Sequence, residues 1–116
     1  MRVLVCGGRD FDNYEELAAA LRKVDNARRI TLLIEGGASG ADALARRWAE
    51  ARGIPVQTFK ADWARWGKAA GPTRNQRMLD EGKPDLVVAF PGDTGTADMI
   101  GRAQRAGVPV EQPIIG

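Results

Sequence analysis

Residues 85–106 read DLVVAFPGDTGTADMIGRAQRA, and this stretch decides the fold of the chain. The apolar run 85–89 has the length and β-branched content of a buried parallel strand. Residues 97–106 are predicted to form a helix that Gly107 ends. The two glycines between these segments permit a tight turn, and the first N–H groups of a helix have no internal partner. The stretch therefore predicts a strand, a loop that cradles an anion, and a helix. For one such loop alone, an ordinary turn is the favoured interpretation.

Two further predicted strands lead into glycine-rich loops. Residues 1–6 are followed by residues 7–10, GGRD, and residues 30–35 by residues 36–42, GGASGAD. The loops that follow parallel strands gather at one edge of the sheet, where open α/β folds bind ligands. The convergence of three such loops predicts a ligand site at that edge.

Length and composition predict one globular domain spanning residues 1–116, because 44% of the residues are hydrophobic and 28% are charged. The 17 basic and 15 acidic residues give a formal charge of +2, too small an excess to predict nucleic-acid binding. The sequence contains no histidine, which excludes Ser-His-Asp and Cys-His catalysis and histidine metal sites. The carboxylates are scattered along the sequence, so we expect neither a metal nor a cofactor.

The single cysteine, Cys6, cannot form an internal disulfide, which fits a reducing compartment. It ends the first predicted strand, where we expect a small buried apolar residue rather than a nucleophile. The opening apolar run is too short for a signal peptide or a membrane span. We therefore expect a cytoplasmic protein that does not contact a membrane.

The remaining segments alternate between strand and helix. Asn13 and Glu16 have the spacing of a capping box and begin a helix that fades near residue 25. The other predicted elements are a helix at 41–52, a strand at 55–59, a helix at 72–81 and an edge strand at 108–113. This order predicts a three-layer αβα sandwich with a five-stranded parallel sheet in the order 3-2-1-4-5. The first and fourth loops would then face each other across one crevice.

Polar residues near the predicted ligand edge have types that suit a nucleotide. Arg74 and Asn75 lie in the first turn of the predicted third helix, where a guanidinium suits a phosphate and an amide suits a base or ribose. The amides of the loop 36–40, with Ser39, are expected to hold a phosphate or ribose. A tight turn with Ser39 as a helix N-cap is an equal alternative. Asp98 stands near a helix N-terminus, where structural and ligand-binding roles both stay open.

Trp63 and Trp66 accompany Arg65 and Lys68 in a segment without strand periodicity. Such tryptophans more often cover a hydrophobic seam or an oligomer interface than stack on a nucleobase. We therefore expect a homo-oligomer, either a dimer or a tetramer.

Four motifs, at residues 7–11, 35–45, 71–78 and 90–99, resemble in order those of the SLOG superfamily. Within that superfamily they are most similar to the small YspA/YpsA-related proteins. The resemblance implies a Rossmann-like fold that binds nucleotides or nucleotide-derived ligands, and it implies sensing of nucleotide signals as one role. It extends to the LOG phosphoribohydrolases, which activate cytokinins, and to the DNA-uptake protein DprA.

The resemblance to LOG enzymes bears on catalysis. Their loop after the fourth strand reads Pro-Gly-Gly-x-Gly-Thr-x-Glu-Glu, and an arginine near the start of the preceding helix acts with the second glutamate. Arg74 matches that arginine. Asp93 stands in place of the second glycine, Asp98 in place of the first glutamate, and Met99 in place of the catalytic glutamate. The resemblance therefore implies the ligand class more firmly than the hydrolase chemistry.

We interpret the chain as a protein that binds a nucleotide-derived small molecule, with sensing as one candidate role; nucleic acid is not an expected partner. Two alternatives stay open. One is an N-glycosidic hydrolase of a nucleoside monophosphate with Arg74 and Asp98 as catalytic residues, and the other is a single-stranded DNA-binding protein. The predicted ligand-binding residues are Gly8, Arg9, Asp10, Gly36, Gly37, Ser39, Gly40, Arg74, Asn75, Pro91, Gly92, Thr94, Gly95 and Thr96.

Overall fold

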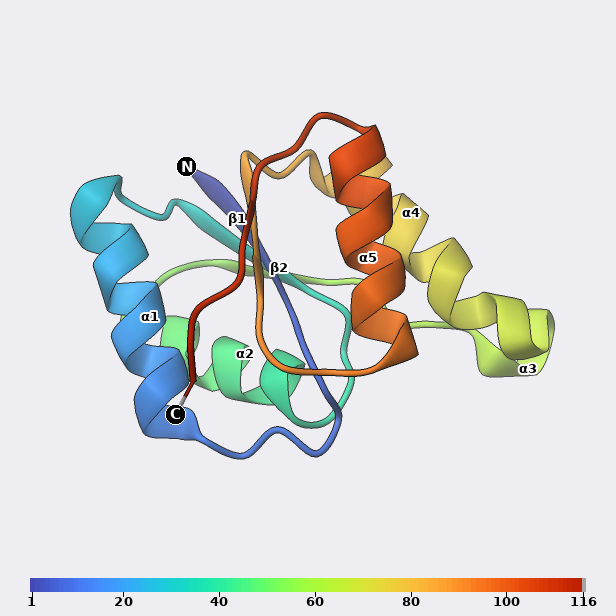
Figure 1. Ribbon diagram of the computed structural model, residues 1–116, viewed down its shortest axis with the longest axis horizontal. Helices are drawn as coiled ribbons and strands as arrows, with labels where there is room; N and C mark the ends of the chain where they lie inside the picture. Colours follow the sequence, from blue (N-terminus) through green and yellow to red (C-terminus); the bar gives the residue numbers. More distant parts are fainter. Residues whose placement is uncertain (116) are drawn as a thin grey trace.

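The computed structural model describes residues 1–115 as a three-layer αβα sandwich (Figure 1). The strands are β1 (Arg2–Cys6), β2 (Leu32–Glu35), β3 (Val56–Thr58), β4 (Leu86–Ala89) and β5 (Val110–Glu111). The helices are α1 (Tyr14–Ala27), α2 (Ala41–Ala51), α3 (Trp63–Trp66), the short 3-10 helix η1 (Gly67–Ala69), α4 (Ala70–Gly82) and α5 (Thr94–Arg105). All strands run parallel in the order β3-β2-β1-β4-β5, which confirms the predicted sheet.

Successive side chains of β1 point to opposite faces of the sheet and contribute to two separate cores. Val3 and Val5 pack with the apolar faces of α1 and α2, while Leu4 and Cys6 pack with α4 and α5. All four side chains are buried, which confirms the predicted burial of Cys6. Because both faces of the sheet are covered by helices, polar chemistry is confined to its edges and ends.

Two helices begin earlier than the sequence predicts. α5 begins at Thr94 rather than at residue 97, so the predicted Gly/Thr loop is in fact the first turn of this helix. α4 begins at Ala70, directly after η1, and Arg74 therefore lies in its second turn rather than its first. Pro72 is tolerated because the first N–H groups of a helix need no internal acceptor. The first turn of each helix contains a glycine, Gly71 in α4 and Gly95 in α5. Glycine has a weak helix propensity, so the sequence does not predict these turns, which tertiary contacts stabilise.

The short helices α3 and η1 were not predicted; the remaining elements follow the prediction, with strands that are shorter than expected. The side chain of Asn13 caps α1 and accepts a hydrogen bond from the N–H of Glu16 at 3.1 Å, which confirms the predicted cap. β5 pairs only with β4 and lies at the sheet edge, as its flanking prolines predict. Among residues 1–115, every helix is too short or too polar to cross a bilayer.

Candidate functional site

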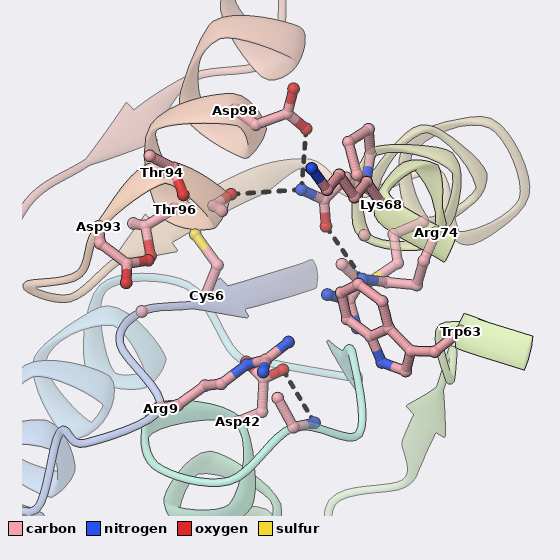
Figure 2. A pocket seen from close by; sticks show the side chains of 17 residues that line it. Cys6, Arg9, Asp42, Trp63, Lys68, Arg74, Asp93, Thr94, Thr96 and Asp98 are labelled. Carbon is pink, nitrogen blue, oxygen red and sulfur yellow. Dashed lines mark hydrogen bonds between the residues drawn. The ribbon is translucent and has the colours of Figure 1, made fainter. Parts of the chain in front are cut away.

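A pocket of about 570 Å³ lies at the carboxyl ends of β1 and β4, and we call it the main pocket. Its walls come from the loop after β1, the segment around the start of α2, the α3–α4 segment and the first turn of α5 (Figure 2). These segments meet because β1 and β4 are neighbours in the sheet, with helices on opposite faces. The main pocket therefore occupies the edge at which the sequence predicts a ligand site.

Three cationic side chains line the main pocket: Arg9, Lys68 and Arg74. Figure 2 shows Arg9 approaching from the β1 side, and Lys68 and Arg74 from the α3–α4 side. In the part of the chain that the structure describes, the ion pairs involve other arginines, so no carboxylate pairs directly with these three groups. Carboxylates from α2 and from the start of α5 also line the pocket, which therefore presents both signs of charge.

The glycine-rich loop after β2 is not free to cradle an anion, because carboxylates of the protein occupy its amides. The N–H groups of Gly36 and Ala38 donate to Asp42 Oδ2 at 3.2 and 3.3 Å. The N–H of Gly37 donates to Glu35 Oε1 at 2.8 Å. The N–H groups of Gly36, Gly37 and Ala38 are therefore already bonded within the protein, which favours the alternative of a tight turn for this part of the loop.

Ser39 is not the N-cap of α2. Its hydroxyl donates to the carbonyl oxygen of Arg9 at 3.2 Å, and Gly40 is the capping residue instead. Gly40 has a φ of 73°, a left-handed conformation that favours glycine, and the N–H of Ala41 donates to the carbonyl of Gly8 at 3.1 Å. The loop after β2 thus fixes the loop after β1, from which the Arg9 side chain projects.

Two carboxylates are buried behind the loop. Glu35 is fully buried and accepts a short hydrogen bond from the hydroxyl of Thr58, and Asp42 is 6% exposed. Burial raises the pKa of Asp42 to about 6; the charge of Glu35 acts in the same direction, while the two loop amides and Arg74 oppose it. Asp42 therefore titrates much closer to neutral pH than an ordinary aspartate.

Arg74 begins a chain of hydrogen bonds that crosses the main pocket. Its Nη1 donates to the carbonyl of Gly36, and its Nε donates to Asn75 Oδ1 at 3.0 Å. Asn75 Nδ2 in turn donates to Asp98 Oδ2 at 3.0 Å and to the carbonyl of Gly95 at 3.3 Å. Asn75 is buried, so its side chain is held in place by these hydrogen bonds. Through Asn75 the bonds link the two predicted catalytic residues, Arg74 and Asp98.

Asp98 lines the main pocket, whereas Met99 points away from it. Arg102 Nε donates to Asp98 Oδ2 at 2.9 Å, the same oxygen that Asn75 reaches. Burial acts to raise the pKa of Asp98, but the hydrogen bonds from Arg102 and Asn75 outweigh it and lower that pKa below its ordinary value. Met99 is fully buried in the core that α4 and α5 form with the sheet. Met99 therefore lies outside the main pocket, and Asp98 is the carboxylate of α5 that the pocket contains.

The first turn of α5 presents backbone amides to the main pocket. Its N-cap, Asp93, makes no side-chain capping bond, and the N–H groups of Thr94, Gly95 and Thr96 have no acceptor within the helix. All four residues line the pocket. A helix N-terminus carries a partial positive charge, so this turn suits an anionic group better than the occupied loop after β2.

Comparison with protein-family models assigns the chain to a family. Residues 1–66 match the model described as the YspA, cpYpsA-related SLOG family. The chain belongs to this family. The SLOG membership predicted from the four sequence motifs is therefore confirmed.

Three known proteins are similar to this SLOG chain over different extents. The gene 61 protein of Mycobacterium phage D29 is 36% identical over 119 residues, which cover 94% of this chain and 93% of that protein. The aspartokinase of Corynebacterium glutamicum is 34% identical over 102 residues, which cover 78% of this chain but 24% of the enzyme. A structure of UDP-GlcNAc 2-epimerase from Neisseria meningitidis bound to UDP-GlcNAc matches with a TM-score of 0.59 and 18% identity, covering 97% of this chain and 32% of the epimerase. At that identity, the similarity shows the Rossmann-like fold alone.

The SLOG structure divides most of the predicted site residues between the main pocket and two neighbouring hollows, and it leaves Gly40, the N-cap of α2, outside all three. The predicted residues that line the main pocket are Arg9, Arg74, Asn75, Thr94, Gly95, Thr96 and Asp98. Those that line only neighbouring hollows are Gly8, Asp10, Pro91 and Gly92 in one, and Gly36, Gly37 and Ser39 in the other. Asp10 is exposed and lines the neighbouring hollow rather than the main pocket.

Cys6, Asp42 and Lys68 line the main pocket although none was predicted there. Cys6 ends β1, and its position at the carboxyl end of a parallel strand is the sequence signal that could have placed it in the pocket. Burial raises the pKa of its thiol to about 12, and it therefore remains protonated at neutral pH. Lys68 lies in η1, where no helix was predicted, and nothing in the sequence pattern directed it to the sheet edge.

Proposed function

We propose that this SLOG protein binds a nucleotide or nucleotide-derived small molecule in the main pocket, and that it acts as a sensor of that ligand. The observation that carries the proposal is the meeting, in one pocket, of three cations that form no ion pair within residues 1–115 and the open first turn of α5. A volume of about 570 Å³ lies within the range typical of small-molecule sites. Charge, shape and position at the sheet edge all suit a phosphate-bearing ligand.

Each part of a nucleotide has a matching group in the main pocket. Arg9, Lys68 and the first turn of α5 suit the phosphate. Asp98 and Asn75 present a carboxylate and an amide to the hydroxyl groups of a ribose. Trp63 is 50% exposed, lines the pocket and offers a ring face for a base; Arg9 lies over this ring at 5.2 Å from its centroid.

Titration calorimetry with AMP, GMP, UMP and the corresponding nucleosides tests this proposal. Arg9→Ala is expected to weaken mononucleotide binding by roughly tenfold, because it removes one charge-assisted contact to phosphate. Arg9 is exposed, so its removal leaves the fold intact. Arg47→Ala is the matched control, since Arg47 also lies over an aromatic ring, that of Tyr14 at 4.2 Å, but outside the main pocket.

The proposal fails if no nucleotide binds, or if the two arginine variants weaken binding equally. An equal loss of nucleoside and nucleotide affinity in Arg9→Ala would contradict the phosphate role. A short deoxythymidine oligonucleotide in the same series tests the single-stranded DNA alternative. Tighter binding of the oligonucleotide than of every mononucleotide would favour that alternative.

The hydrogen-bond chain Arg74–Asn75–Asp98 favours one second candidate function, N-glycosidic hydrolysis of a nucleoside monophosphate. In that reaction water attacks C1′ of the ribose, the N-glycosidic bond breaks, and the base leaves after accepting a proton. The lowered pKa of Asp98 keeps its carboxylate ionised, which would stabilise positive charge that develops on the ribose. Chromatography of released free base tests this candidate. Activity that Asp98→Asn abolishes would support it, and no release by the wild type would exclude it.

A further inference from the structure

A second hollow, of about 360 Å³, adjoins the main pocket. It is lined by residues 36–39 and 60–61, and it shares Arg9, Ala38, Trp63 and Arg74 with the main pocket. We call it the Lys60 hollow. Arg9 and Trp63 line both spaces. One ligand placed against these two side chains could therefore extend into the main pocket and into the Lys60 hollow.

The Lys60 hollow differs from the main pocket in its charge. Its lining contains three cations, Arg9, Lys60 and Arg74, and no carboxylate, whereas carboxylates of α2 and α5 line the main pocket. Across residues 1–115, none of these cations belongs to an ion pair. The carboxylate of Glu35 is fully buried and bonded within the protein. Three cations around one concave space repel one another, and an anion placed among them relieves that repulsion.

The amides of the adjacent loop do not supply the anion contacts of this hollow, because they are bonded to buried carboxylates. Those bonds nevertheless fix the loop, and the carbonyl of Gly36 accepts a hydrogen bond from Arg74. The glycines also keep the space open: an added Cβ on Gly37 would come within 3.0 Å of Lys60 Cγ. The loop therefore acts as a rigid wall that positions Arg74, and the anion contacts fall to side chains.

We propose that the Lys60 hollow is a second anion subsite, with Lys60 as its characteristic residue. The ligand class rests on the proposed function: it is a nucleotide with two anionic groups, one in the main pocket and one in the Lys60 hollow. Such compounds are nucleoside bisphosphates, nucleoside diphosphates and pyrophosphate-linked dinucleotides. A mononucleotide bound in the main pocket would leave Lys60 without an anionic partner and bind more weakly.

Calorimetry tests this proposal with AMP, ADP, adenosine 3′,5′-bisphosphate and a pyrophosphate-linked dinucleotide, repeated with guanine and uracil as the base. The series is run at one low ionic strength, because Lys60 is exposed and salt screens its charge. At least one ligand with two anionic groups is expected to bind roughly tenfold more tightly than its mononucleotide. Lys60→Ala is expected to remove this difference without changing mononucleotide affinity. Lys23→Ala, an exposed lysine on α1, is the matched control.

Each outcome decides the proposal. If the second anionic group adds no affinity, or if its gain survives in Lys60→Ala, the Lys60 subsite is wrong while mononucleotide binding still supports the proposed function. If no nucleotide binds, the proposed function fails, and phosphorus NMR with inorganic pyrophosphate then tests the subsite alone. Line broadening that Lys60→Ala removes would retain the subsite, whereas no broadening by the wild type would overturn it.

Discussion

Asp42→Asn is expected to make the protein more stable at neutral pH and to change how its stability depends on pH. Asp42 is almost fully buried, and the two loop amides that it binds both donate to Oδ2. The amide oxygen of an asparagine can accept both bonds, so the loop keeps its geometry while the buried negative charge disappears. The substitution therefore isolates the cost of that charge.

The magnitude follows from the raised pKa of Asp42. The ordinary pKa of this carboxyl is 3.8 and its pKa in the fold is about 6, a difference of about two pH units. Between these values the folded protein holds a proton that the unfolded chain has lost, so the free energy of unfolding of the wild type falls as the pH rises. Each unit corresponds to about 1.4 kcal/mol, so the full cost is about 3 kcal/mol, reached slightly above pH 6. Asp42→Asn has no carboxylate at this position, so its free energy of unfolding is not lowered in this way.

Urea denaturation followed by circular dichroism, from about pH 4 to about pH 8, measures the prediction. The stability difference between Asp42→Asn and the wild type should be small at the acid end and grow to about 2–3 kcal/mol at the upper end. Asp12→Asn, an exposed aspartate outside the main pocket, controls for the loss of one negative charge. Parallel pH profiles for the wild type and Asp42→Asn, or a less stable variant at neutral pH, would refute the reasoning.

Three other predictions concern single positions. Gly95→Val should abolish nucleotide binding in calorimetry with an unchanged fold, because its Cβ meets no atom within 4 Å yet lies in the pocket wall. Its control, Gly92→Ala, should lower the free energy of unfolding by about 1–3 kcal/mol, since its Cβ would overlap Thr96 Oγ1; equal stability of the two variants would contradict this. Lys83→Gly should raise the free energy of unfolding in urea by about 1 kcal/mol, because Lys83 ends α4 with a φ of 50°; no gain would mean that this conformation carries no cost. Light scattering should find a dimer or tetramer that Trp66→Ser dissociates, because Trp66 is 46% exposed; a monomeric wild type at micromolar concentration would exclude this interface.

The sequence by itself determined the fold and the edge of the sheet at which the pocket lies. Apolar runs such as 85–89 alternate with segments of helical periodicity, and that alternation admits few arrangements other than a parallel sheet covered by helices. The prolines flanking β5 placed it at the edge, and the four motifs identified the SLOG family. The apolar runs, helical periodicities and prolines are local features of the sequence. A strand that is buried on both faces of a sheet is apolar along its whole length, which makes it easy to recognise.

Only the tertiary structure decided which groups the main pocket offers to a ligand. The amides after β2 look free in the sequence, yet the packing of α2 turns Asp42 toward them. The start of α5 looks like a loop, yet it is a helical turn with open amides, because helix propensity is weaker than tertiary contacts. The same helix turns Met99 into the core and leaves Asp98 in the pocket, since adjacent helical residues point about 100° apart. Residue type and spacing indicate where a site forms, but its free donors and charges depend on side-chain directions that only packing fixes.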